Sequence, residues 1–323
     1  MYVEKKKIKG HVYNYLKMSA RKSNQVKTKT IAYLGKEPMS KKKIQERIAA
    51  IPKSKIEAVK KELRGEDLNL SFLSLKQLEK LKEIKNDFAK KLKKLDQKLI
   101  ADMFRDFKTH YIYNTNAIEG NTLTLEETNF LLNENRSPEG KDLREIYDHI
   151  NEKEVFDNLL KNKPEINKEQ IIDIHSKLMK NIDKRVGDFR KHNVRVFGAN
   201  FETSSAKYVE TDMNILLRWY KKEKRRLHPL ILAAVFHEKF ERIHPFYDGN
   251  GRTGRMLLNL MLLKRELPPL VIKNKTRKEY YRVLSTGHKA DLNKIESEYY
   301  QEIVTFCYKQ LLNTYEDIFD RWG

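Results

Sequence analysis

The sequence predicts a mainly α-helical protein with a small basic β-sheet extension at its N-terminal end. After residue 74, apolar residues recur mostly every three or four positions, which is the period of a helix buried on one side. Two earlier segments, 11–17 and 26–34, alternate and are rich in β-branched and aromatic residues, as strands are. Charge follows the same division, because residues 1–64 hold 19 Lys or Arg and 5 Asp or Glu, a net +14 of the chain's +21.

Residues 1–65 are predicted to form the extension. Its two alternating segments would pair as a hairpin, and residues 2–8 could add a third strand to give a meander. Residues 40–64 are typical of one or two short helices, with Ser40 and Ser54 as N-caps.

The basic charge of the extension indicates an anionic partner, of which nucleic acid is the commonest. Exposed Tyr and Lys side chains on one face of the sheet could bind it by stacking on bases and contacting phosphates. A solvated basic sheet that docks on the helical part explains the same residues equally well.

Residues 74–112 are predicted to form one long helix that links the extension to the core. Ser74 would cap it, and its apolar residues fall into two rows at heptad spacing. The rows contain Leu78, Leu92 and Leu99, and Leu81, Phe88 and Leu95. Such a seam could join two copies of the chain into a homodimer, but so few heptads favour a helix packed on its own domain.

The composition is that of a globular protein without disulfides. Cys307 is the only cysteine, which fits a reducing compartment. The apolar run 256–263 is too short to span a membrane, and residues 1–7 lack the apolar core of a signal peptide. We therefore expect a cytoplasmic protein with no membrane partner.

The strongest pattern is residues 244–255, His-Pro-Phe-Tyr-Asp-Gly-Asn-Gly-Arg-Thr-Gly-Arg, between two apolar segments of helical period. Gly249 and Gly251 would let a ligand approach the backbone closely, and the amides that open the second helix form an anion site. Arg252 and Arg255 lie three residues apart in that helix, and planar guanidinium groups suit phosphate oxygens. This loop is therefore predicted to bind phosphate groups.

Two further side chains of the loop suggest a reaction. Asp248 is a hard oxygen ligand of the kind that phosphate-bound Mg²⁺ needs. His244 ends the first helix and could act as a base near neutral pH. A plain turn would explain the glycines and the His-Pro pair, but it needs no such cluster of His, Asp, Asn and Arg.

This run resembles the signature of Fic-domain proteins, His-x-Phe-x-(Asp/Glu)-Gly-Asn-Gly-Arg-x-x-Arg, with every fixed position filled. The resemblance extends from about residue 100 to 300 through three further segments. These are Gly187-Asp-Phe-Arg190, His228-Pro-Leu and Phe240-x-x-Ile243. It implies a Fic-type helical core over residues 113–310, followed by a helix end at 311–323, and nucleotidyl transfer, usually of AMP from ATP to a protein hydroxyl.

The resemblance also implies roles for the loop residues. The ATP phosphates would lie on the amides of residues 249–251, with Asn250 at the α-phosphate. Arg252 would support the β-phosphate and Arg255 the γ-phosphate, while Asp248 would hold Mg²⁺.

In the same scheme, His244 would take the proton of a target Ser, Thr or Tyr hydroxyl. Relatives that transfer UMP, phosphocholine or a phosphate leave those reactions open as alternatives. A regulator that binds nucleic acid through residues 1–64 is a further alternative, of a different class.

Residues 113–120 resemble the family's inhibitory helix motif, (Ser/Thr)-x-x-x-Glu-(Gly/Asn), with Thr115 and Glu119 at the fixed positions. In such proteins the Glu pairs with the second signature Arg, here Arg255. An ordinary surface glutamate before the helix stop at Gly120 is the alternative.

Two more expectations follow from the resemblance. Residues 185–210 break the helical pattern, and short alternating segments around residues 198–200 predict a β-hairpin flap that would align a target segment by strand pairing. Tyr280 could line an adenine pocket, although an aromatic residue at helical spacing is more often a packing residue.

Overall fold

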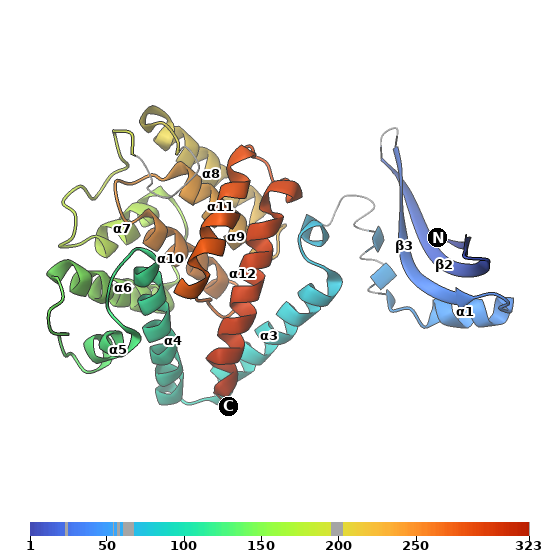
Figure 1. Cartoon of the computed structure of the whole chain (residues 1–323), viewed down its shortest axis with the longest axis horizontal. Coiled ribbons are helices and arrows are strands. Elements are labelled where there is room, and N and C mark those ends of the chain that lie inside the picture. The colour runs from blue at the N-terminus through green and yellow to red at the C-terminus, as the bar shows by residue number, and fades with distance from the viewer. Residues whose placement is uncertain (23–24, 54, 57–58, 61–67, 195–202, 323) are drawn as a thin grey trace. The chain divides into compact units, whose positions relative to one another are not determined.

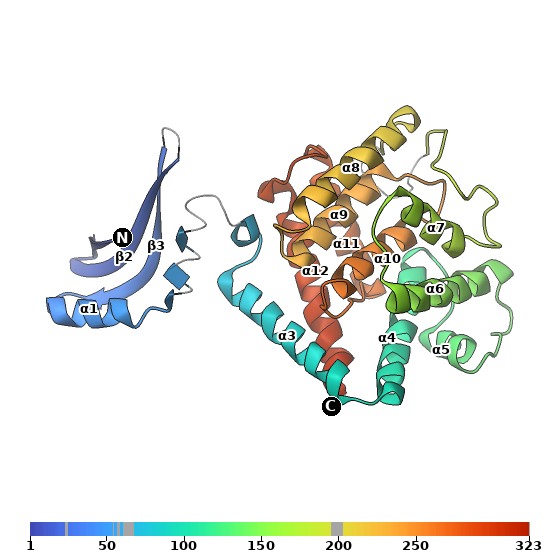
Figure 2. The ribbon, with the colours of Figure 1, turned by 180° about the vertical axis from the view of Figure 1, so that it is seen from behind.

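The computed structural model describes residues 1–22, 25–53, 55–56, 59–60, 68–194 and 203–322. The chain separates into two compact units, which we call the N-terminal unit (Met1–Leu78) and the helical unit (Glu79–Gly323). Figure 1 and Figure 2 both show the sheet of the N-terminal unit and the helical bundle of the helical unit. The predicted fold class, mainly helical with a small basic sheet, is confirmed.

The N-terminal unit is built on an antiparallel three-stranded sheet in the order β1-β2-β3. The strands are β1 (Tyr2–Ile8), β2 (His11–Lys22) and β3 (Gln25–Lys36). The predicted meander is therefore present. Each strand pairs with its neighbour in sequence, as the facing pairs Tyr2–Lys17 and Tyr15–Tyr33 show.

One face of this sheet is covered by helix α1 (Lys41–Ala49). Ser40 caps α1 as predicted, because its hydroxyl accepts the backbone N–H of Lys43 at 3.3 Å. The helix packs on a small core that consists of Leu16, Met18, Ile31, Leu34 and Val59, with Ile44 and Ile48 of α1 against it. The other expected cap, Ser54, lies outside the described residues.

The long helix expected over residues 74–112 is wrong as a single element. Two helices occupy this stretch and the residues after it, α3 (Leu75–Lys94) and α4 (Gln97–Ile118). Asp96 causes the break, since its extended backbone starts α4 and its carboxylate accepts the N–H of Leu99 at 2.8 Å. The α3 row Leu81, Ile84 and Phe88 is buried within the protein, as expected of a helix packed on its own domain.

Two successive helices form the centre of the helical unit, α9 (Pro229–Ile243) and α10 (Asn250–Leu263). All of α9 after its first residue is buried, and α10 is buried except at Gly251. The surrounding helices are α5 (Leu125–Asn133), α6 (Leu143–Asn162), α7 (Lys168–Leu178), α8 (Val209–Glu223), α11 (Arg277–Thr286) and α12 (Ser297–Asp317). Short 3₁₀ turns occur at η1 (Leu68–Ser71), η2 (Ala206–Tyr208), η3 (Asn274–Thr276), η4 (Gly287–Lys289) and η5 (Phe319–Arg321).

The tip of the predicted β-hairpin flap, residues 195–202, lies outside the described residues. Within 185–194 and 203–210, which are described, the chain forms no strand and enters α8 through η2. The flap therefore stays a prediction. In the part of the chain that the structure describes, no helix has both the length and the apolarity needed to cross a bilayer.

Candidate active site

Hydrogen bonds within the loop between α9 and α10 stabilise its conformation. The side-chain amide of Asn250 donates to the carbonyl of Phe246 at 2.9 Å and accepts the N–H of Phe246 at 2.8 Å. Phe246 stacks on His175 of α7 with ring centroids 3.6 Å apart, and His175 Nε2 lies 3.0 Å from the carbonyl of Asp248. Because one N–H and the oxygen of the Asn250 amide bond within the loop, its second amide N–H and its backbone N–H remain for the predicted phosphate contact.

Both predicted glycines permit close approaches. Gly249 has φ +74° at the N-cap of α10, and a side chain there would overlap Met179. A side chain at Gly251 would overlap the carboxylate of Glu119. The first turn of α10, where backbone N–H groups attract negative charge, is thus occupied by an anion from the chain itself.

Arg255 of α10 contacts both predicted residues of the inhibitory motif. Its Nη2 donates to the Glu119 carboxylate at 2.6 Å, and its Nε donates to the Thr115 hydroxyl at 2.7 Å. Arg255 is 3% exposed, whereas the Glu119 side chain is 37% exposed. Burial by itself would lower the pKa of Arg255, but the nearby Glu119 raises it well above the usual value. The structure therefore brings together all three residues of the predicted inhibitory contact.

Arg252 has partners that the sequence did not reveal. Its guanidinium forms an ion pair with Asp148 of α6 and lies 3.6 Å from Asp248. Glu152, one turn after Asp148, is also buried, and that burial raises its pKa well above the usual value. In the sequence, only the four-residue spacing of Asp148 and Glu152, which places them on the same side of a helix, could have indicated these partners of Arg252.

Asp248 carries its negative charge at neutral pH. Burial would raise its pKa, but Arg252, the N–H of Gly249 and Arg144 more than offset this effect and lower it. Among the described residues, no three His, Cys, Asp or Glu side chains gather to hold a metal ion. Mg²⁺ is commonly bound by one or two carboxylates plus substrate phosphates, and a single ionised Asp beside a phosphate site fits that mode.

His244, the predicted base, is the C-cap residue of α9. It ends α9 in the left-handed region, with φ 52°, and its Nδ1 lies 3.3 Å from the carbonyl of Glu241. That contact places the hydrogen on Nδ1, so the lone pair is on Nε2, which no hydrogen bond from the described residues occupies. Burial lowers the pKa of His244 to about 4, which keeps the ring neutral near pH 7.

The backbone of His244 is held by Arg190, the last residue of the Gly187-Asp-Phe-Arg190 segment. Arg190 Nε donates to the His244 carbonyl at 2.7 Å, and its Nη1 donates to the carbonyl of His192 at 3.0 Å. A third bond reaches the carbonyl of Ser204. One buried guanidinium thus ties the end of α9 to the segments on both sides of residues 195–202.

The adenine-pocket role expected of Tyr280 stays a prediction, and the structure shows a deeply buried side chain. Tyr280 is 1% exposed, and its hydroxyl lies 2.7 Å from His237 Nε2 and 3.4 Å from Arg255 Nη1. It packs behind Arg255 as a core residue, which was the alternative interpretation. In this structure the Tyr280 hydroxyl accepts a hydrogen bond from the Arg255 guanidinium.

Comparisons with known proteins agree with this geometry. Residues 165–262, which include the whole loop, all of α9 and all but the last residue of α10, match the model of the Fic/DOC family. The chain is 35% identical over 196 residues to protein adenylyltransferase fic-1 of Caenorhabditis elegans, covering 59% of this chain and 38% of that protein. It is 31% identical over 230 residues to protein adenylyltransferase Fic of Nematostella vectensis, covering 67% and 53%. The chain thus spans about half or less of the length of these curated relatives.

Solved structures show the same fold. A fragment of Fic-1 from C. elegans superposes with a TM-score of 0.64 at 25% identity, covering 88% of this chain and 78% of that one. A Fic-domain signaling protein from Bacteroides thetaiotaomicron gives a TM-score of 0.64 at 24% identity, over 74% of this chain and 94% of that one. This chain therefore carries a domain of the Fic/DOC family, which includes the His244 loop.

Proposed function

We propose that the protein is a protein adenylyltransferase, which transfers AMP from ATP to a Ser, Thr or Tyr hydroxyl of a protein. The observation that carries this proposal is the position of His244. A neutral imidazole with a free Nε2 lies five residues before the N-cap of α10, whose first two turns carry Arg252 and Arg255. The names of the curated relatives support the same activity.

In the proposed reaction the target hydroxyl oxygen attacks the α-phosphorus of ATP. A new oxygen–phosphorus bond forms, the bond to the β-phosphate oxygen breaks, and His244 Nε2 takes the hydroxyl proton. The amides of residues 249–251 hold the phosphates, and Arg252 and Arg255 stabilise the charge that builds on pyrophosphate. Asp248 would hold Mg²⁺, which neutralises phosphate charge when bound.

The position of the radioactive label separates this activity from the alternatives. Protein labelled by ATP carrying ³²P at the α-phosphate, but not at the γ-phosphate, indicates AMP transfer, whereas the reverse indicates phosphorylation. An excess of UTP or CDP-choline that suppresses labelling would favour transfer of UMP or phosphocholine. His244→Ala should abolish labelling while leaving ATP binding nearly unchanged, and labelling that persists in this variant would refute the role of His244.

We also propose that Glu119 inhibits this activity. Its carboxylate lies against Gly251 and is bound to Arg255, so it occupies both the helix start and the cation that would receive the γ-phosphate. A triphosphate cannot use these groups until Glu119 leaves. Breaking the Glu119–Arg255 pair leaves the buried Arg255 charge without its partner until another anion binds. The pair is therefore suited to switch between a closed and an open state.

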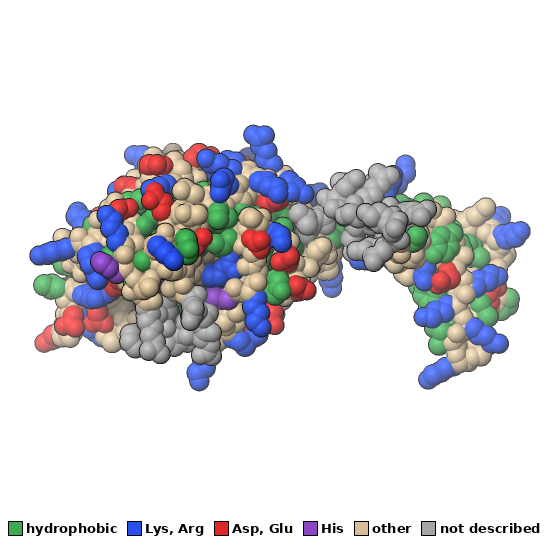
Figure 3. Space-filling view, turned by 90° about the horizontal axis from the view of Figure 1, so that it is seen from above, with side chains coloured by type: hydrophobic (Ala, Val, Ile, Leu, Met, Phe, Trp, Pro, Cys, Tyr) green, Lys and Arg blue, Asp and Glu red, His purple; other side chains and the backbone are tan. Residues whose placement is uncertain are grey.

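The open face of the sheet in the N-terminal unit supports a second function, binding of single-stranded nucleic acid. We define this tyrosine face by Tyr13, Tyr15 and Tyr33, whose rings lie in contact with centroids 5.4 Å (Tyr15–Tyr33) and 6.2 Å (Tyr13–Tyr33) apart. Lys6 and Lys36 both pair across the strands with Tyr13, so they share its face. On this unit, Lys and Arg side chains are interspersed with side chains of the hydrophobic class, which includes Tyr (Figure 3).

Aromatic side chains between lysines suit bases and phosphates together. Labelled 12-nucleotide RNA and DNA strands should therefore raise the anisotropy signal of the full chain, with affinity that falls as salt rises. Tyr33→Ala should weaken binding at least about fivefold. Tyr208→Ala, which removes an exposed tyrosine of the helical unit, is the control and should have no effect. Equal binding by both variants would refute this function.

A further inference from the structure

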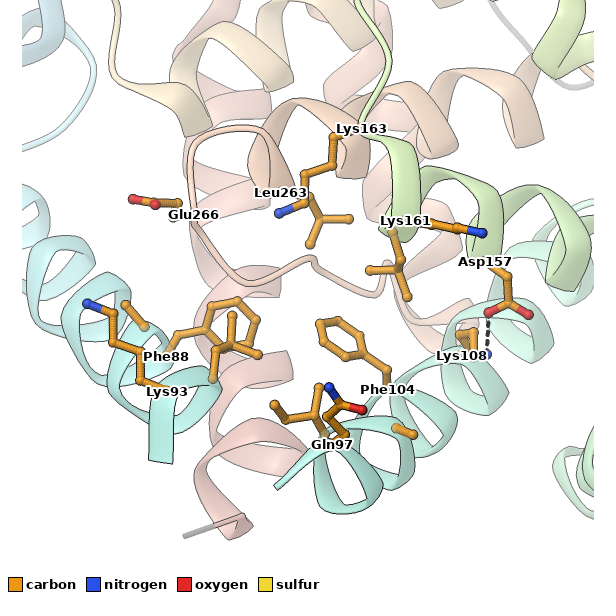
Figure 4. Close-up of a pocket in the computed structure, with 15 residues that line it drawn as sticks. Phe88, Lys93, Gln97, Phe104, Lys108, Asp157, Lys161, Lys163, Leu263 and Glu266 are labelled. Atoms are coloured by element: carbon orange, nitrogen blue, oxygen red, sulfur yellow. Dashed lines mark hydrogen bonds and ion pairs between the residues drawn. The ribbon is translucent and has the colours of Figure 1, made fainter. Parts of the chain in front are cut away.

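A cavity of about 870 Å³ lies within the helical unit, away from the His244 loop (Figure 4). Its walls come from α3, the first half of α4, the end of α6 and the end of α10. The apolar part of the lining consists of Phe88, Leu92, Ile100, Phe104, Leu160 and Leu263. Because α10 runs from the loop to this cavity, the two sites are roughly 20 Å apart.

The rim of this cavity is positively charged. Lys93 comes from α3, and Lys161 and Lys163 come from the end of α6. The two acidic residues of the lining form ion pairs with other lysines, since Asp157 pairs with Lys108 and Glu266 lies 3.4 Å from Lys85.

In the part of the chain that is described, no carboxylate pairs with any of the rim lysines Lys93, Lys161 and Lys163. Their long carbon chains can follow the apolar walls while the ammonium groups stay at the opening.

We propose that this cavity binds an amphipathic anion, a fatty acid with a medium-length chain. The hydrocarbon chain would lie among the Phe, Leu and Ile side chains, where each buried methylene adds to affinity. The carboxylate would meet the ammonium group of Lys163, which lies beside Leu263, whereas those of Lys93 and Lys161 lie farther out on opposite sides (Figure 4). The volume is within the range of small-molecule sites, and four elements surround the cavity, so a compact ligand fits it better than a partner helix that needs a long groove (Figure 4).

The cavity is connected to the inhibitory contact by α4. Ile100 and Phe104 line the cavity near one end of this helix, and Thr115 and Glu119 hold Arg255 at the other. The cavity is formed while Glu119 is bound to Arg255. A ligand that fits this arrangement stabilises it, so the fatty acid should strengthen inhibition, a consequence that rests on the proposed adenylyltransferase activity.

Calorimetric titration of the full chain with dodecanoate, below its micelle concentration, tests the site itself. The wild type should bind saturably. Ala101→Trp fills the cavity from a solvent-exposed position and should abolish binding. The double variant Lys161→Glu, Lys163→Glu should bind at least tenfold more weakly.

The control places the same charge changes at exposed lysines outside the cavity, in Lys221→Glu, Lys309→Glu, which should bind like the wild type. No saturable binding by the wild type, or equal binding by Ala101→Trp, overturns the site.

Self-labelling with α-labelled ATP tests the connection to Glu119. Dodecanoate should lower labelling of the wild type and leave labelling of Glu119→Gly and Ala101→Trp unchanged. Dodecanoate that binds but does not lower wild-type labelling overturns the regulatory step and leaves the site standing. Absence of labelling from every variant counts against the proposed activity, while the calorimetry still decides whether the cavity binds its ligand.

Discussion

At Glu119, one carboxylate contacts the Arg255 guanidinium and the first turn of α10, the two features that would receive a triphosphate. We therefore predict that Glu119→Gly raises self-labelling. A hydrogen bond between charged groups contributes about 1.5–3 kcal/mol, which corresponds to a rise of roughly 10- to 150-fold. Initial rates with α-labelled ATP measure the change. Glu139→Gly, a matched replacement in an exposed loop, should label like the wild type, and equal rates for the two variants would rule out inhibition by Glu119.

At His244, burial lowers the pKa to about 4, so the base is available over a wide pH range. Labelling by Glu119→Gly should stay nearly constant from about pH 8 to about pH 5 and fall only nearer pH 4. An inflection near pH 6.5, the usual value for His, would contradict this assignment.

The same pKa shift bears on stability. Between about pH 4 and 6.5 the unfolded chain binds a proton at His244 that the folded protein does not. His244 therefore destabilises the folded state as the pH falls through this range. Near-ultraviolet circular dichroism at each pH is needed to show that a loss of labelling is not a loss of fold.

At the scale of elements, α4 is the helix that places Glu119, and its start depends on Asp96. Asp96→Ala removes the side chain that accepts the Leu99 N–H, so the free energy of unfolding should fall by about 0.5–2 kcal/mol. Chemical denaturation of the full chain measures this loss. Lys98→Ala, an exposed change in the first turn of the same helix, should cost little. An equal loss in both variants would show that the cap contributes nothing.

Local features of the fold could be predicted from the sequence, because each depends on residues close together in the chain. The strands, the Ser40 cap and the loop glycines are of this kind. The break at Asp96 was missed because Leu99 continues the heptad spacing, although in the structure Leu99 is 40% exposed.

The contacts that complete the site could not be predicted in this way. Arg252 meets Asp148 across 104 positions of sequence, and the Arg190 bond to His244 spans 54. Such contacts depend on how helices pack against one another, and no local periodicity records that arrangement. The Glu119–Arg255 contact, 136 positions apart, was expected only because of the family resemblance.

At the scale of the whole molecule, each unit has a hydrophobic core of its own. The core of the N-terminal unit is complete with Leu16, Met18, Ile31, Leu34 and Val59. The helical unit is centred on α9 and α10, which are buried among other helices of the same unit. Folding of the helical unit should therefore not require the strands.

Deleting residues 1–73, so that the chain begins at the Ser74 cap of α3, should leave a protein that unfolds cooperatively and still labels itself. Combined with Glu119→Gly, the deletion should keep the raised labelling rate, because Arg255, Asp248 and His244 all lie in the helical unit. Binding of single-stranded RNA or DNA should disappear, since the tyrosine face is removed. A deletion variant that folds but cannot label would show that the N-terminal unit takes part in the reaction, and nucleic-acid binding that survives would place the basic surface elsewhere.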